Sequence, residues 1–405
     1  MNHQKSRAWR AALPGLTAFL LLLSILASPK EAYEAALSGL DVFLHSVFPA
    51  LLPFFIASEI MAGLGVVDFL SVLLDPIMGP LFRCPGCSSF IWIMSITSGY
   101  PTGARLVSMF RKQKKITVDE AQRILSFCST SGPLFLVGAV SVSMLNSPKS
   151  GTILLISHFS AAILIGLAFR FYHTKGLMRH KSSVSLPKAL SALSSARKRD
   201  GRPIGQIMGD SVRNSVNVLL MVGGFIILFS VIIDLLMRIR VIDALAAILS
   251  VLLKPFRPDP SLIKAVIGGM IEMTAGGKLV SAAFVSMDRK IAAVSFLIGW
   301  SGLSIHAQTA GILSGTGIRF RSYILGKFFH GLIAALISLP LTRLLYPEAA
   351  EVSAPLPGGF PPDWKEYFLS SWKLLFAALL CIALAAAISY ARNRNKKKGS
   401  RKITA

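Results

Sequence analysis

The sequence is poor in charged side chains, and among these it is poor in acidic ones. Only 15% of its 405 residues are charged, and 19 Asp and Glu stand against 43 Lys and Arg. A soluble globular chain carries about 25% charged residues. Because 53% of the residues are hydrophobic and the mean hydropathy is +0.62, the composition excludes an ordinary soluble domain. It predicts an all-α polytopic membrane protein.

Cysteine is scarce, and the common catalytic signatures are missing. Four cysteines are too few and too scattered for a disulfide framework: Cys84, Cys87, Cys128 and Cys381. The CPGC stretch at 84–87 lacks the second cysteine pair that a structural zinc site needs, so we interpret it as a turn at the membrane surface. The sequence contains no GxxxxGKS, HExxH or GxSxG motif. We therefore expect no enzyme activity, no metal and no cofactor.

Apolar runs predict about eight transmembrane helices, with two further segments that enter the bilayer without crossing it. The eight spans are expected at 11–28, 37–62, 117–145, 150–172, 217–237, 290–316, 320–345 and 368–390. The segments 86–110 and 261–286 are broken at their centres by TSGYPTG and TAGG, which predicts two re-entrant hairpins. The first span could be a cleaved signal peptide or a retained helix, and retention is favoured because the rest of the chain is membrane-bound.

The positive charge is concentrated rather than spread evenly. Residues 1–10, 111–115, 173–203 and 391–405 supply 21 of the 24 net positive charges. The positive-inside rule then predicts a multi-pass protein of the cell membrane with both termini cytoplasmic. The exception is the segment 238–257, whose basic residues would lie outside. Such clusters contact membrane lipid. No aromatic-interleaved basic fold accompanies them, so we expect no nucleic-acid partner.

Two parts of the chain repeat one order of elements: a span, a surface segment, a hairpin, a broken span and a span. TGARLVSMF in the first copy resembles AGGKLVSAAF in the second and pairs Arg105 with Lys278. Each copy has three full crossings, and an odd number inverts the second copy relative to the first. The predicted organisation is an N-terminal helix and loop (1–36), a first repeat (37–172), a basic cytoplasmic linker with an amphipathic segment (173–216), a second, inverted repeat (217–345), and an external loop, last helix and basic tail (346–405).

Small residues and proline interrupt the helices at 98–103, 131–133, 274–277 and 301–304. Hydrocarbon does not tolerate the unpaired backbone groups of such breaks, so they must face protein or a watery cavity. In transporters, half-helix ends of this kind cradle a solute or ion near the membrane midplane. We therefore expect the four breaks to form one substrate site. Its predicted residues are Gly99, Tyr100, Pro101, Gly103, Arg105, Ser131, Gly132, Glu272, Thr274, Gly276, Lys278, Ser301, Gly302, Ser304, His306 and Gln308.

Three charged residues lie at or near the hairpin tips: Arg105, Glu272 and Lys278. A charge at the bilayer centre costs about 2.5 to 3.5 kcal/mol on insertion scales. In the functional interpretation, Glu272 binds a coupling cation or proton while the two basic residues hold an anionic or polar substrate, and either E272Q or R105A abolishes function without loss of protein. In the structural interpretation, a neighbouring basic residue neutralises Glu272 or the basic side chains reach the surface.

Other polar residues within the spans have two interpretations as well. His306 and Gln308 follow the last break, and they either line the cavity or form interhelical hydrogen bonds. His45 and His158 are expected to serve packing. Glu59 is either a third buried acid or the end of the second span.

Four runs carry a resemblance to a known family: SGYPTGARLV, RILSFCSTSGPLFLVGAV, GMIEMTAGGKLV and IGWSGLSIHAQTAGIL. Over about residues 10–345 the chain resembles the sporulation integral membrane protein YlbJ family of endospore-forming bacteria. The resemblance implies kinship with the Gate, or nucleoside-recognition, domain and a role in endospore formation. It supplies no defined binding residues, so the roles given above rest on the residues themselves.

Two functions remain open from the sequence. One is a sporulation-associated transporter or permease that moves a small polar solute or ion between the two hairpins. The other is a non-transporting membrane scaffold that recruits sporulation membrane proteins through the basic linker and tail, for spore envelope or cortex formation. Deleting 173–200 and 391–405 separates them, because only a scaffold needs these segments.

Overall fold

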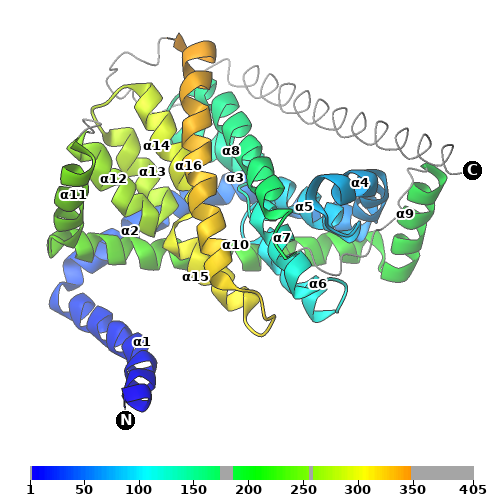
Figure 1. Cartoon of the computed structure of the whole chain (residues 1–405), viewed down its shortest axis with the longest axis horizontal. Helices are drawn as coiled ribbons and strands as arrows, with labels where there is room; N and C mark the ends of the chain where they lie inside the picture. Colours follow the sequence, from blue (N-terminus) through cyan, green and yellow to red (C-terminus); the bar gives the residue numbers. More distant parts are fainter. Residues whose placement is uncertain (1, 174–185, 255–258, 348–405) are drawn as a thin grey trace, which may run out of the picture.

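The computed structural model describes residues 2–173, 186–254 and 259–347, and this part of the chain is helical without a β-strand (Figure 1). It holds four helices long and apolar enough to cross a membrane, or up to six when each sharply bent helix pair is counted as one span. The all-α membrane class is therefore confirmed. The span predicted at 368–390 lies outside the described residues.

The first half of the chain begins with α1 and then forms a hairpin and a broken helix between longer helices. Its elements are α1 (Asn2–Ala27), α2 (Pro29–Val42), the π-helix η1 (Phe43–Val47), α3 (Phe48–Gly63), α4 (Val66–Phe82), α5 (Cys87–Ser98), α6 (Thr102–Lys112), α7 (Val118–Cys128), the π-helix η2 (Phe135–Met144) and α8 (Pro148–Phe169).

The second half follows the same order after the basic linker. Its elements are α9 (Leu186–Asp200), α10 (Ile204–Arg238), α11 (Val241–Leu252), α12 (Pro260–Ile271), α13 (Met273–Ala282), α14 (Met287–Trp300), α15 (Gly302–Leu313) and α16 (Phe320–Leu345). Helices α5 and α6 form the first predicted hairpin, and α12 and α13 form the second. The two predicted broken spans are α7 with η2 and α14 with α15.

Three predicted boundaries differ from the structure. The helix predicted at 217–237 is α10, which begins at Ile204 and takes in the second part of the expected linker. The break in the second hairpin falls at Glu272 rather than at 274–277, and the TAGG stretch lies inside α13. The helix predicted at 37–62 begins at Pro29 and contains η1. Hydropathy reports apolar content and not helix formation. It therefore did not predict that the polar first turns of α10 are helical.

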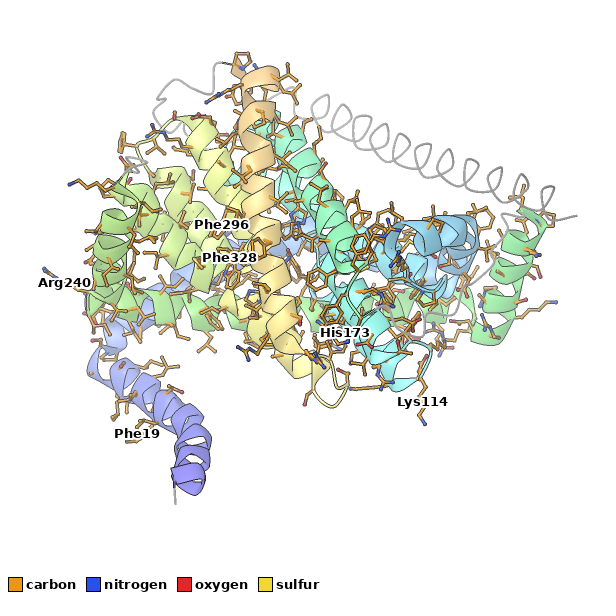
Figure 2. All side chains as sticks on the ribbon, viewed as in Figure 1. Phe19, Lys114, His173, Arg240, Phe296 and Phe328 are labelled. Carbon is orange, nitrogen blue, oxygen red and sulfur yellow. The ribbon has the colours of Figure 1, made fainter. Side chains whose placement is uncertain are left out.

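Helix α16 packs against α14 through a contact between small residues. A Cβ on Gly299 would lie 2.4 Å from the Cα of Gly331, so the two backbones meet without side chains between them. Phe296 and Phe328 pack edge to face beside this contact, with ring centroids 6.0 Å apart (Figure 2). Close approach over small residues is the usual way for helices to associate in membranes. It fixes the position of α16, which also packs against α8 of the first half.

The loops that follow α8 and α15 are both hydrogen-bonded to α7. The Gln122 side chain exchanges hydrogen bonds of 3.1 and 2.9 Å with the backbone of Arg319. The buried Arg123 guanidinium donates to the carbonyl groups of Tyr172 and His173, at 2.9 and 3.1 Å. The ends of α6 and α15 lie at the same lower edge of the molecule (Figure 1). Helix α7 thus joins the loop before α16 to the start of the basic segment 173–203.

Candidate functional site

The first hairpin breaks at its tip, between α5 and α6. Gly99 has a φ of +71°, in the region that favours glycine. A Cβ there would lie 2.6 Å from the backbone nitrogen of Gly132, in the break between α7 and η2. The first hairpin tip and the first helix break therefore touch backbone to backbone.

The second half of the chain repeats this arrangement. Gly302 has a φ of +78°, and a Cβ on it would lie 3.1 Å from the backbone nitrogen of Met273. The indole Nε1 of Trp300 donates to the carbonyl oxygen of Met270 at 2.9 Å. The break between α14 and α15 is thus held against the tip of the second hairpin.

A buried cavity of about 40 Å³ lies where the two pairs of breaks meet. Four of its apolar lining residues come from η1, α3 and α10: Val47, Leu51, Val222 and Ile226. The predicted site residues that line it are Gly99, Tyr100, Ser131, Gly132, Glu272, Thr274, Ser304 and Gln308. Breaks that are up to about two hundred residues apart in the chain therefore surround one space, as the backbone argument predicted.

Glu272 is the charged residue of the cavity lining, and it is 2% exposed. Its carboxylate accepts from the backbone nitrogens of Thr274 (3.0 Å) and Ala275 (2.6 Å), and from Thr274 Oγ1 (2.5 Å). It therefore caps the N-terminus of α13, where a negative charge complements the helix dipole.

Gln308 and His306 lie on α15 beyond the last break, and both are buried. Gln308 lines the cavity, and its Oε1 has no hydrogen-bond partner among the described residues. The two ring nitrogens of His306 also lack partners in this part of the chain, and the ring packs edge to face on Trp300, 4.4 Å away between centroids. Gln308 thus offers a polar atom to the cavity, whereas His306 lies outside its lining.

The structure does not bring Arg105 and Lys278 into the cavity. Both side chains are exposed, on α6 and α13, and neither lines the cavity. Among the described residues neither forms an ion pair with Glu272, so the neutralisation considered above is not observed either. Helical periodicity explains this: residues a few positions beyond a hairpin tip already lie on the outer face of the leg.

The remaining predicted residues are buried in the packing around the breaks. A Cβ on Gly103 would lie 1.8 Å from the Cys128 carbonyl oxygen, and one on Gly276 would lie 2.0 Å from the Gly269 Cα. Pro101, Ser301 and Gly302 are buried at the breaks themselves. These residues allow close approach of backbones, and they shape the site without lining it.

Two other expectations concern the first half. His45 is not a packing residue, since its side chain is 76% exposed and lies 2.9 Å from the Asp41 carboxylate. Glu59 is half-buried within α3 rather than at its end. Within the described part of the chain, no group of three or more His, Cys, Asp or Glu side chains is arranged to hold a metal ion.

Sequence reasoning missed a buried polar cluster beside the cavity. Lys327 on α16 is 1% exposed, and its Nζ lies 2.7 Å from the Ser129 carbonyl oxygen, 3.1 Å from Tyr100 Oη and 3.3 Å from His330 Nδ1. His330 Nε2 donates to the carbonyl oxygen of His158 at 3.0 Å. His158 Nε2 in turn accepts from the backbone nitrogen of Ser131. A Lys and a His three residues apart in an apolar helix were the available signal.

Comparisons with known proteins agree on the membrane family. The Gate family, described as nucleoside recognition, matches residues 44–174. The sporulation integral membrane protein YlbJ of Bacillus subtilis (strain 168) is 38% identical over 386 residues, which cover 93% of this chain and 94% of that protein.

Solved structures of CNTnw are also similar to this chain. One in an inward-facing substrate-bound state has a TM-score of 0.46 at 17% identity and covers 85% of this chain and 88% of that one. A point variant of CNTnw in an intermediate state has a TM-score of 0.43 at 15% identity, over 83% and 85% of the two chains. On the strength of the sequence identity to its Bacillus relative, the chain belongs to the YlbJ family of sporulation integral membrane proteins.

Proposed function

We propose that the protein is a permease of the sporulating cell's membrane, which moves a small polar solute or ion through the cavity between the two hairpins. The observation that carries the proposal is the shared lining: all four helix breaks contribute to one buried space that contains the Glu272 carboxylate and the unpartnered Gln308 Oε1. Breaks facing such a space are the general architecture of solute sites in transporters.

The size of the cavity limits what it holds in this conformation. A single water molecule needs about 10–15 Å³ on this measure, so about 40 Å³ accommodates a few water molecules or one small ion. A larger solute would require the hairpins to separate from the broken helices. The Gly99–Gly132 and Gly302–Met273 contacts are the places where they would part.

The test exchanges Glu272 for Gln in a Bacillus subtilis strain that lacks its own YlbJ. Glutamine keeps the volume but loses the charge, and its NH2 group cannot accept the hydrogen bonds that one of the two carboxylate oxygens accepts. We expect heat-resistant spores to fall sharply, with a normal amount of protein in the membrane. R105A is the matched control, because Arg105 is exposed away from the cavity, and it should leave spore counts near those of the wild type.

The outcomes also separate the permease from the scaffold. A scaffold should tolerate E272Q and fail when 391–405 is deleted or the basic side chains of 197–199 are neutralised. A permease should show the reverse. Loss of protein from the membrane in E272Q would mean that Glu272 serves folding alone, and it would remove the support for the proposal.

A further inference from the structure

The Lys327 ammonium lies at the C-terminal end of a broken helix. Ser129 follows the last residue of α7, and its carbonyl oxygen accepts from Lys327 Nζ at 2.7 Å. Unpaired carbonyl groups at a helix C-terminus carry partial negative charge and favour a cation. Among the described residues no carboxylate pairs with Lys327, so backbone and neutral side chains alone surround this charge.

The surrounding groups offer hydrogen-bond acceptors to the ammonium form of the side chain. Tyr100 Oη donates its own hydrogen to the Ile298 carbonyl oxygen at 2.8 Å, so it receives one from Lys327. His330 Nε2 donates to the carbonyl oxygen of His158, so in the neutral imidazole Nδ1 is an acceptor that faces Nζ. With the Ser129 carbonyl oxygen, three acceptors therefore surround Nζ. An ammonium supplies three N–H groups, whereas a neutral amine supplies only two.

The position matters because of what such helix ends do elsewhere. In transporters, unwound carbonyls and half-helix C-termini coordinate Na⁺ or a proton. Here the cation is the Lys327 ammonium, which is covalently attached to the protein. It comes from the other half of the chain, since Lys327 is on α16 and Ser129 follows α7. Lys327 also contacts Tyr100, which lines the cavity, with Nζ 5.0 Å from the ring centroid.

We infer that Lys327 is a built-in cation that occupies the cation position of the first helix break and holds this break against the first hairpin tip. The first break then needs no metal ion. If the protein is a permease, as proposed above, its solute movement should not depend on an alkali cation bound at the first break. This consequence for transport rests on the proposed function.

The experiment measures thermal unfolding of the purified full-length protein in detergent. In K327A the missing side-chain atoms correspond to propylammonium, so this ion is the probe, and 1-propanol supplies the same apolar volume without charge. We expect K327A to unfold several degrees below the wild type and to recover with propylammonium more than with 1-propanol. The wild type should unfold at the same temperature in sodium chloride and in choline chloride.

Two variants make the result decisive. K327M keeps the volume but not the charge, so it should be destabilised and unaffected by propylammonium; should K327A fail to fold, K327M decides alone. Lys290 is the matched control, because it is 5% exposed and its Nζ donates to a backbone carbonyl, that of Ser281, at 2.7 Å. Ser281 lies in the last turn of α13, at a helix end that forms no break, so rescue of K290A by propylammonium equal to that of K327A would overturn a special role for the first break.

A K327M protein as stable as the wild type would overturn the inference, and so would equal rescue of K327A by 1-propanol and propylammonium. A sodium-dependent increase in wild-type stability that K327M abolishes would also overturn it. None of these outcomes depends on spore counts. Failure of the E272Q test would leave the role of Lys327 standing, and failure here would leave the Glu272 site standing.

Discussion

At the scale of single residues, the predictable members of the site lie within the breaks and the unpredictable one lies in a continuous helix. Glu272 lies between two pairs of glycines, Gly268–Gly269 and Gly276–Gly277. Its position before Thr274 is that of an N-cap, so the sequence alone draws attention to it. Lys327 has no such context. Its partners Tyr100 and Ser129 are 227 and 198 residues away in the chain, and only tertiary structure brings them together.

Asp200 gives a prediction for the α9–α10 corner, outside the membrane-spanning helices. The Arg202 guanidinium donates two hydrogen bonds to the Asp200 carboxylate, at 2.7 and 2.8 Å, and these hold the pKa of Asp200 at about 2, below the ordinary 3.8. Because the pKa of Asp200 is lower in the folded state, its ionised carboxylate stabilises the fold above about pH 4. This stabilisation is lost as the pH falls toward 2 and the carboxylate is protonated. We expect D200N to unfold at a slightly lower temperature than the wild type at pH 7, with the gap closing between pH 4 and pH 2.

Thermal unfolding of both proteins across this pH range checks the prediction. The gap should be small, because ion pairs at a protein surface contribute little to stability, and both side chains of this pair are only partly buried. A gap that stays constant down to pH 2, or no gap at pH 7, would contradict the role assigned to the pair.

At the scale of elements, composition predicted both hairpins and both broken spans because glycine, proline and serine interrupt apolar runs there. Composition could not predict the exact residue at which each helix is interrupted. TAGG lies within α13, because Gly276 serves to bring α12 and α13 together rather than to interrupt the helix. The π-helices η1 and η2 have no distinct apolar period, and the first turns of α10 contain the charged Asp210 and Arg213. These features depend on packing that hydropathy does not report.

Gly103 gives a prediction about the contact between the first hairpin and the first broken helix. Its hypothetical Cβ lies 1.8 Å from the Cys128 carbonyl oxygen, a backbone atom that cannot turn aside. We expect G103A to push α6 from α7 and to destabilise the protein by about 1–3 kcal/mol or more. G209A is the control, because Gly209 lies in α10 with no atom within 4 Å of its hypothetical Cβ.

Thermal unfolding in detergent compares the two variants. G209A should match or exceed the wild type, since glycine inside a helix costs about 0.5–1 kcal/mol relative to alanine. A G103A protein as stable as G209A would mean that α6 and α7 are not held in this contact.

At the scale of the whole molecule, the two halves are joined through the site rather than merely placed beside each other. Tyr100 of the first half donates to Ile298 of the second, and Lys327 of the second half holds the break at Ser129 of the first. Helix α10 runs across the lower part of the molecule, from α11 at one end to α9 at the other (Figure 1). The repeated order of elements was predictable from sequence, but these exchanges between the halves were not.

The central claim is that the cavity between the breaks is a passage open in turn to each side of the membrane. The most direct test introduces S304C, at a position that lines the cavity, into a protein whose own four cysteines have been replaced. Reaction of the new thiol with a small, membrane-impermeant reagent is then measured in sealed right-side-out and inverted vesicles. We predict that the S304C thiol reacts from both sides, and more slowly when E272Q is added, whereas reaction from neither side, or from one side alone, would contradict the claim.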